Sequence, residues 1–135
     1  MDSFDIRTHQ RTELVELTDR VRQVVQRRGL REGICVVYCP HTTAAITVNE
    51  NADPDVVHDM LAWLNHAIPE HQPDFRHGEG NSDAHIKASL VGSSVTLLVD
   101  NGNLVLGRWQ GVYFCEFDGP RTRTVQIQCL RTETA

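Results

Sequence analysis

The sequence predicts an α+β domain in which mixed, largely antiparallel β-sheet layers pack against two or three helices. Strand-like and helix-like segments alternate without a strict strand–helix–strand repeat, which separates this class from α/β. The segment 124–130 alternates between apolar and polar residues, as a half-buried strand does. Asn101-Gly102 lies between two apolar runs and is typical of the tight hairpin that joins antiparallel strands.

The first half of the chain begins with an extended segment or hairpin and continues into a helix over 18–28. Thr18 is expected to cap this helix and Gly29 to end it. The runs 33–38 and 42–48 are rich in β-branched residues and predict two strands.

A second helix is predicted by Asp53 as N-cap, by Pro54 in the first helical position and by Pro69 as its stop. Its apolar residues recur at helical spacing: Val56, Val57, Met60, Leu61, Leu64 and Ile68. A polar loop over 69–81 follows.

A short helix over 82–91 is expected to end at Gly92. Beyond it the chain is β-like, with predicted strands over 95–99, 104–106 and 112–117 in addition to 124–130. The long run of hairpin-connected strands favours antiparallel sheets.

Length and charge narrow the function classes. A chain of 135 residues is expected to form a single domain over 1–135. With 13 Lys and Arg against 18 Asp and Glu, the net charge of −5 argues against a nucleic-acid partner. The sequence has no apolar stretch of membrane-spanning length and its first residues lack a signal-peptide pattern, so we expect a cytoplasmic protein without a membrane partner.

The four cysteines lack CxxC spacing and fall in apolar or strand-like runs: Cys35, Cys39, Cys115 and Cys129. We expect buried free thiols rather than a disulfide scaffold.

Three polar stretches interrupt the core pattern, and the first runs from Pro40 to Pro54. His41 follows directly after Pro40, whose ring fixes the local backbone, and both an ordinary exposed histidine and a functional one fit this position. Asp53 is explained as a helix cap, whereas Glu50 has no such structural role.

The second polar stretch spans 77–89 and contains His77 and His85. Backbone N–H groups at the start of the helix, around Gly80–Ser82, are suited to an anion such as phosphate, with Lys87 one turn further on. Two histidines near carboxylates also suit a divalent metal, although their spacing matches no known metal motif.

The third polar stretch places Glu116 and Asp118 on one face of a strand, with Arg121 and Arg123 following in the same alternation. Two interpretations stay open. The arginines pair with the carboxylates, which are costly to bury alone, or they form a fork for phosphate. Together the three stretches predict a polar site suited to a phosphorylated ligand, a metal, or both.

The same stretches resemble the signatures of the YjbQ-like family, also called the secondary thiamine-phosphate synthase family. The resemblance rests on 41–50 with Asp53-Pro54, on 79–81 with 84–87, and on 106–110 with 116–123. It implies an α+β subunit assembled as a homotrimer, with a polar cleft close to a subunit boundary.

The resemblance further implies an enzyme acting on small phosphorylated substrates, with thiamine phosphate synthesis from a pyrimidine diphosphate and a thiazole phosphate as an activity. The implied catalytic residues are His41, His85, Glu50 and Glu116. The implied phosphate-binding residues are Gly80, Asn81, Ser82, Lys87, Arg121 and Arg123. A divalent ion, Mg²⁺ or Zn²⁺, would fall to His41, His77 and His85, with Glu50, Glu79, Glu116 and Asp118 as further ligands.

Two other classes of function remain open on the sequence. One is a metal-dependent hydrolase, and the other is a non-catalytic binding module for a phosphorylated metabolite.

Overall fold

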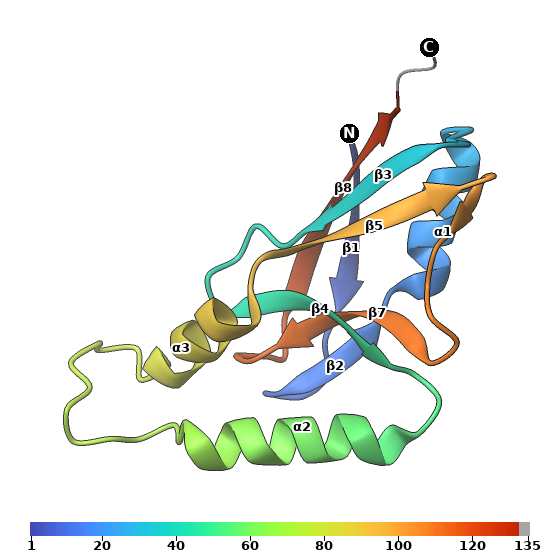
Figure 1. Cartoon of the computed structure of the whole chain (residues 1–135). Helices are drawn as coiled ribbons and strands as arrows, with labels where there is room; N and C mark the ends of the chain where they lie inside the picture. Colours follow the sequence, from blue (N-terminus) through green and yellow to red (C-terminus); the bar gives the residue numbers. More distant parts are fainter. Residues whose placement is uncertain (133–135) are drawn as a thin grey trace.

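The computed structural model describes residues 1–132 as two β-sheets with three helices (Figure 1). The strands are β1 (Asp2–Arg7), β2 (Glu13–Glu16), β3 (Gly33–Tyr38), β4 (Ala44–Glu50), β5 (Ser94–Asp100), β6 (Asn103–Leu104), β7 (Gln110–Glu116) and β8 (Thr122–Arg131). The helices are α1 (Thr18–Arg27), α2 (Pro54–Ala67) and α3 (Ser82–Val91).

The larger sheet has the strand order β1-β8-β3-β5-β6 and the smaller one the order β2-β7-β4. Every strand pairing among residues 1–132 is antiparallel. Figure 1 shows α1 beside the larger sheet, and α3 and α2 on the side of the smaller sheet. This arrangement confirms the predicted α+β class.

The main core lies under α1, between its apolar face and the two sheets. Val21, Val24 and Val25 of the helix are almost completely buried against strand residues such as Val37 and Phe114. A smaller cluster under α3 consists of Ala45, Ala84, Ala88, Cys115 and Phe117, with Leu61 and Leu64 of α2 packed against it. Because small residues line this cluster, α3 approaches β4 closely.

The two later helices begin and end as predicted. The Asp53 carboxylate accepts the N–H of Asp55 at 2.9 Å and caps α2. Gly92 ends α3 with φ of +104°, a conformation that residues with a Cβ rarely adopt.

The prediction that Thr18 caps α1 was wrong. The N-cap position is Leu17, and the Thr18 hydroxyl instead donates to Glu16 at 2.8 Å and accepts the backbone N–H of Val112 at 2.9 Å. Tertiary contact with β7 therefore uses the oxygen that a cap would need.

Two strand boundaries also differ from the sequence prediction. β4 starts at Ala44 instead of Thr42, and just before it the Thr43 backbone carbonyl accepts the N–H of Phe117 and a hydrogen bond from Arg123. β6 ends at Leu104 instead of Leu106, although the Val105 N–H still donates to the Leu98 carbonyl at 2.8 Å and Leu106 packs against the main core. Within residues 1–132, no helix has the length and apolar character needed to cross a membrane.

Candidate functional site

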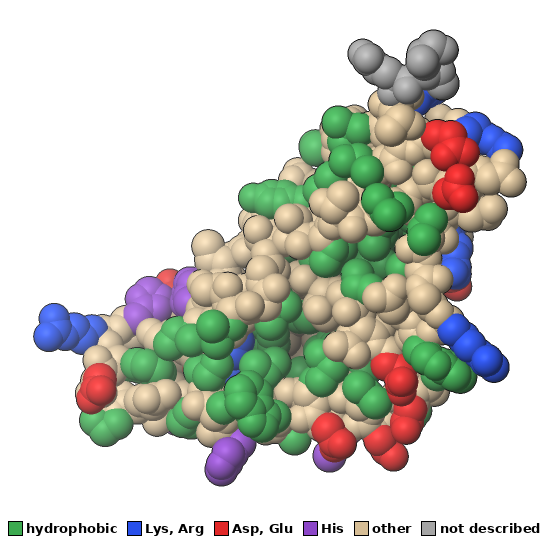
Figure 2. Space-filling view, viewed as in Figure 1, with side chains coloured by type: hydrophobic (Ala, Val, Ile, Leu, Met, Phe, Trp, Pro, Cys, Tyr) green, Lys and Arg blue, Asp and Glu red, His purple; other side chains and the backbone are tan. Residues whose placement is uncertain are grey.

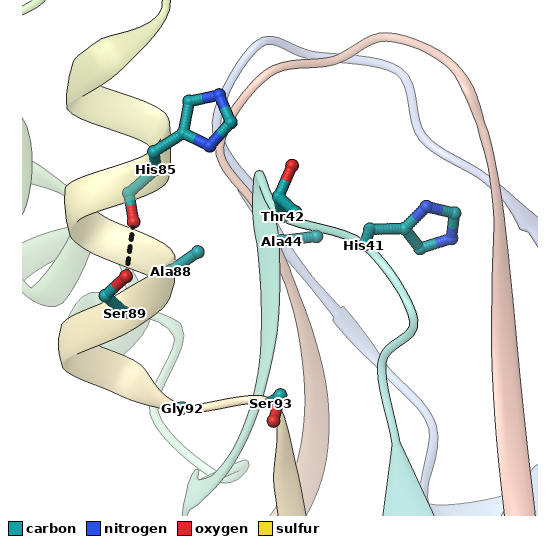
Figure 3. A pocket seen from close by; sticks show the side chains of 8 residues that line it. All are labelled: His41, Thr42, Ala44, His85, Ala88, Ser89, Gly92 and Ser93. Atoms are coloured by element: carbon teal, nitrogen blue, oxygen red, sulfur yellow. Dashed lines mark hydrogen bonds between the residues drawn. The ribbon is translucent and has the colours of Figure 1, made fainter.

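A cavity of about 500 Å³ lies between the segment leading into β4 and one face of α3 (Figure 3). Its lining residues are His41, Thr42, Ala44, His85, Ala88, Ser89, Gly92 and Ser93. The small residues on the facing surfaces of α3 and β4 leave this space open. In this described part of the chain, the lining contains two imidazoles and three hydroxyl side chains but no carboxylate.

His41 is positioned by the backbone on both sides. Pro40 precedes it, and the ring turns away from α3 toward β8 (Figure 3), where its Nε2 accepts the N–H of Thr124 at 2.9 Å. An Nε2 that accepts a hydrogen bond places the proton of the neutral ring on Nδ1. His41 is therefore a hydrogen-bond donor through Nδ1.

The charge state of His41 follows from its surroundings. Burial lowers its pKa below the ordinary value, and the positive charge of Arg123 adds to this effect, followed by a smaller effect of Arg121. The ring is consequently neutral near pH 7, in a region of positive potential.

His85 lies on α3 and borders two hollows at once. One is the cavity shared with His41, and the second is an open hollow of about 620 Å³ on the other side. That second hollow is lined by Asp74, Phe75, Arg76, His77, Ser82, His85 and Ile86. The rings of His77 and His85 meet edge to face with centroids 5.6 Å apart. Figure 2 shows histidine side chains gathered beside the start of α3.

Glu116 and Arg123 form a buried clasp behind the cavity. The Arg123 side chain donates to both carboxylate oxygens of Glu116, through Nε at 2.8 Å and through Nη2. The clasp is completed by Thr8, whose hydroxyl donates to Glu116 at 2.8 Å, and by Thr43, whose hydroxyl accepts from Arg123 at 2.9 Å. Burial alone would raise the pKa of Glu116, but the hydrogen bonds from Arg123, the Asp118 N–H and Thr8 outweigh burial and lower it.

The third polar stretch was open to two interpretations, in which its arginines either pair with carboxylates or form a fork for phosphate. Arg123 is 3% exposed and pairs with Glu116, while the exposed Arg121 pairs with Asp118 at 3.1 Å. Glu116 is 0% exposed, so the structure places it behind the cavity rather than in its lining. The arginines thus pair with carboxylates, and the phosphate fork is not formed by Arg123.

A second buried ion cluster lies on the opposite side of α3. Asp83, completely buried, accepts two hydrogen bonds from Arg11 at 3.0 Å and one from Lys87 at 2.9 Å. Lys87, 1% exposed, also donates to Asn65 on α2 at 2.8 Å. Burial would raise the pKa of Asp83, but the two cations outweigh it and lower the pKa. Lys87 therefore faces a separate cavity of about 320 Å³, and the structure does not bring it to His41 and His85.

The start of α3 lacks a side-chain cap. Asn81 is the N-cap residue, but its side chain makes no capping hydrogen bond and instead donates to Asp118 at 2.7 Å. Its buried Oδ1 has no partner among the described residues. Gly80 takes φ of +72° just before the helix, and Ser82 faces the hollow of His77.

Glu50 lies at the far end of β4 from His41, so the structure does not place it at the cavity. Seven strand residues at about 3.3 Å each put roughly 20 Å between the two ends of β4. There the Glu50 carbonyl accepts the hydroxyl of Tyr113 at 3.0 Å.

The metal prediction finds no matching arrangement in the structure. In residues 1–132, no group of three or more His, Cys, Asp or Glu side chains converges to hold a metal ion. His41 already uses Nε2 for Thr124, and His77 lies 3.8 Å from Glu79. The donor set of residues 1–132 therefore does not fit a resident ion.

Thr8 and Arg11 are the residues that sequence reasoning missed. Both come from the N-terminal segment, and their partners Glu116 and Asp83 lie 108 and 72 positions away. A lone threonine and a lone arginine in an extended segment give no local signal. The buried carboxylates were the available clue, since each needs a partner.

Comparison with known proteins gives a match along nearly the whole chain. A family model described as "UPF0047 protein YjbQ-like" matches residues 2–132. The chain is 51% identical to the UPF0047 protein YugU of Bacillus subtilis, covering 96% of this chain and 98% of the relative. It is 49% identical to the UPF0047 protein MJ1081 of Methanocaldococcus jannaschii, covering 94% and 91%.

Solved structures show the same fold. A YjbQ/UPF0047 family protein from Clostridium acetobutylicum superposes with a TM-score of 0.94 at 48% identity, covering 96% of this chain and all of that one. The protein APE1520 from Aeropyrum pernix superposes with a TM-score of 0.92 at 35% identity, covering 97% and 98%. The names of these relatives state no activity.

Proposed function

The chain belongs to the UPF0047 YjbQ-like family, and from the geometry of its histidine cavity we propose that it binds a small phosphorylated molecule there and acts on it by proton transfer. One observation carries the proposal. Two histidines from distant segments, His41 and His85, line one cavity that has hydroxyls but no carboxylate among its described lining residues. Such a lining offers hydrogen-bond donors to phosphate oxygens without repelling them.

The electrostatics of the cavity support an anionic ligand. Among the charged groups near His41, Arg123 has the largest effect and lowers its pKa, Glu116 raises it and Arg121 lowers it again, so the net field at the ring is positive. A phosphate that enters this field is attracted and raises the pKa of His41 again. Binding of the anion is therefore coupled to protonation of the imidazole.

The reaction that we propose to test first is the formation of thiamine phosphate from a pyrimidine diphosphate and a thiazole phosphate. The reaction requires few groups from the protein. The thiazole nitrogen forms a bond to the methylene carbon of the pyrimidine as the bond from that carbon to the diphosphate oxygen breaks, and hydrogen-bond donors must meet the charge on the leaving pyrophosphate. His41 supplies a donor through Nδ1, and His85 stands at the border of the two hollows, where it can meet either substrate. Any Mg²⁺ would arrive with the diphosphate, as it does at many phosphate sites.

We also propose that the working unit is a homotrimer. Within residues 1–132 no side chain of α2 is buried, and Trp63 on this helix is 65% exposed. Val91 of α3 joins α2 residues in lining an apolar hollow there, and Leu90 beside it is 68% exposed. Exposed apolar surface of this kind is typical of an interface between subunits. Sedimentation of the purified chain tests the trimer directly.

Ligand binding and turnover are best measured separately. Calorimetric titration with inorganic pyrophosphate should give saturable binding that His85→Ala and His41→Ala each weaken by about tenfold or more, since each removes a charge-assisted hydrogen bond. His58→Ala is the matched control, because His58 lies on α2 with its side chain 76% exposed, away from the cavity. Undiminished binding in both cavity variants would overturn the proposed site.

Turnover is followed as thiamine phosphate formed in the presence of Mg²⁺. Product that disappears in His85→Ala and persists in His58→Ala supports the synthase reaction. Product at equal levels in both variants contradicts it. Saturable pyrophosphate binding without any product supports the alternative of a binding module for a phosphorylated metabolite.

A further inference from the structure

Two cysteines face each other directly across the β3–β8 ladder. Cys35 on β3 is the register partner of Cys129 on β8, and the two strands run side by side in the larger sheet (Figure 1). Both residues follow the alternation that sends Val37 and Ile127 into the core, so both thiols lie on the same face of the sheet. Within residues 1–132 all four cysteines are free thiols.

The distance between the Cα atoms of Cys35 and Cys129 depends on which residue pairs of the ladder are hydrogen-bonded. The N–H of Thr132 donates to the carbonyl of Glu32 at 3.0 Å, which makes 32 and 132 a hydrogen-bonded pair just beyond the Gly33–Arg131 register. Hydrogen-bonded and non-hydrogen-bonded pairs alternate along an antiparallel ladder, so Cys35 and Cys129 form a non-hydrogen-bonded pair. In such pairs the Cα atoms are about 4.5 Å apart, inside the range of about 4.4–6.8 Å found for disulfides.

The two thiols differ in access. Cys35 is 0% exposed, and burial, helped by the neighbouring Cys129, raises its pKa to about 12. Cys129 is only half-buried, near the open end of β8. An oxidant from solution therefore meets Cys129 first, and the protected Cys35 lies behind it as the resolving thiol.

We propose that Cys35 and Cys129 form a reversible cross-strand disulfide when the chain meets a peroxide. The Cys129 thiol loses its proton and the thiolate sulfur attacks the peroxide, so that an S–O bond forms as the O–O bond breaks. The hydroxide that leaves takes up the thiol proton as one water. The sulfur of Cys35 then displaces the hydroxyl of the resulting sulfenic acid. The S–S bond forms, the S–O bond breaks, and the Cys35 proton leaves with the hydroxide as a second water.

The bridge would join the two strands that hold His41. β3 leads through Cys39 and Pro40 to His41, and β8 supplies the Thr124 N–H that binds its ring. Cross-linking residues so far apart in sequence restricts the unfolded chain, so the oxidised protein should unfold at a temperature higher by roughly 5–15 °C.

The test is a thiol count on the native protein after treatment with hydrogen peroxide. Denaturation, alkylation and mass spectrometry should find two of the four thiols protected, with the peptides of Cys35 and Cys129 linked, and a thiol reductant should restore all four. Cys129→Ser, at the half-buried position, should protect no thiol pair and show no rise in unfolding temperature on oxidation. The control Cys39→Ala should still protect the pair, because Cys39 has no register partner in this ladder.

The wild-type result decides the matter independently of whether any variant folds. Four alkylated thiols after full treatment would overturn the proposal. So would a disulfide that includes Cys39 or Cys115, or one that joins two chains through Cys129.

Discussion

The buried ion clusters and the histidine cavity lie on opposite sides of the same elements but are built by opposite rules. In the clusters, Glu116 and Asp83 meet arginine or lysine at hydrogen-bond distance and are closed to solvent. In the cavity lining, His41 and His85 have no ion-pair partner among residues 1–132, and His41 is held only by the Thr124 backbone N–H. The buried charged side chains Asp83, Lys87, Glu116 and Arg123 are thus paired within the fold, whereas the cavity is lined by imidazoles and hydroxyls.

The difference shows that a cluster of ionisable residues in the sequence is not by itself a ligand site. A buried carboxylate costs free energy unless a cation satisfies it, so opposite charges that lie close in the fold pair with each other first. The pairs then hold the walls of the site: Arg123 joins Glu116 to Thr43, next to the start of β4, and Lys87 joins α3 to Asn65 of α2. The ion pairs hold the segments around the cavity in place, and the histidines and hydroxyls that line the cavity are the groups that can contact a ligand.

The largest expected effect comes from opening a clasp. Glu116→Ala leaves the Arg123 guanidinium buried without its carboxylate and should lower the free energy of unfolding by about 3–5 kcal/mol, measured by urea denaturation. The double variant Glu116→Leu/Arg123→Met should recover much of the loss, since it removes both buried charges. Asp19→Ala, which breaks the exposed pair with Arg22, is the control and should change stability little. If Glu116→Ala were as stable as the control, the buried Glu116–Arg123 pair would contribute no more to stability than an exposed ion pair, which would contradict the prediction.

An intermediate effect is expected from pH: stability falls on acidification in both regions, but in different pH ranges. The folded-state pKa of His41 lies below the unfolded value of about 6.5, so the unfolded state binds more protons and stability falls as the pH drops below about 6.5. The pKa values of Asp83 and Glu116 are lowered, so the stability they contribute is present at neutral pH and is lost only on further acidification, below about pH 4.

The measurement is a urea series between about pH 7.5 and about pH 5. His41→Gln retains an acceptor for the Thr124 N–H but does not titrate, so its stability should vary less with pH than that of the wild type. A variant that follows the wild-type curve through this range would show that the cavity imidazole is not the group responsible.

The smallest effect on stability is expected within the cavity itself. Thr42→Val removes a hydroxyl from the exposed lining and should leave the free energy of unfolding within about 0.5 kcal/mol of wild type. The same change should raise the Kd for pyrophosphate by roughly 3–10-fold, the effect of one hydrogen bond. If stability fell strongly and binding did not change, Thr42 would belong to the scaffold rather than to the ligand site.

Much of the fold was predictable because its signals are local. The Asp53-Pro54 start of α2, the Gly92 end of α3 and the Asn101-Gly102 hairpin each depend on residues within a few positions of one another. The Thr18 cap failed because a distant strand claimed the hydroxyl, which no local pattern reveals.

The site was predictable only in part. His41 and His85 were singled out from polar segments and do share a cavity, while Glu50 was singled out on the same grounds and lies at the other end of its strand. The residue type and the polar segment do not determine whether a side chain reaches the cavity. That depends on how far along the strand the residue lies and on which face of the helix it occupies. Lys87 shows the same limit: two positions from His85 on a helix, it faces the opposite side.

The hydrogen bond from the Thr124 backbone to His41 has a consequence for how the gene tolerates change. The atom that sets the proton on His41 belongs to the main chain, so nearly any side chain at position 124 preserves it. Proline is the exception, because it has no N–H to donate. In a library that contains every substitution, position 124 should therefore accept nearly all side chains except proline. Position 41 should accept few.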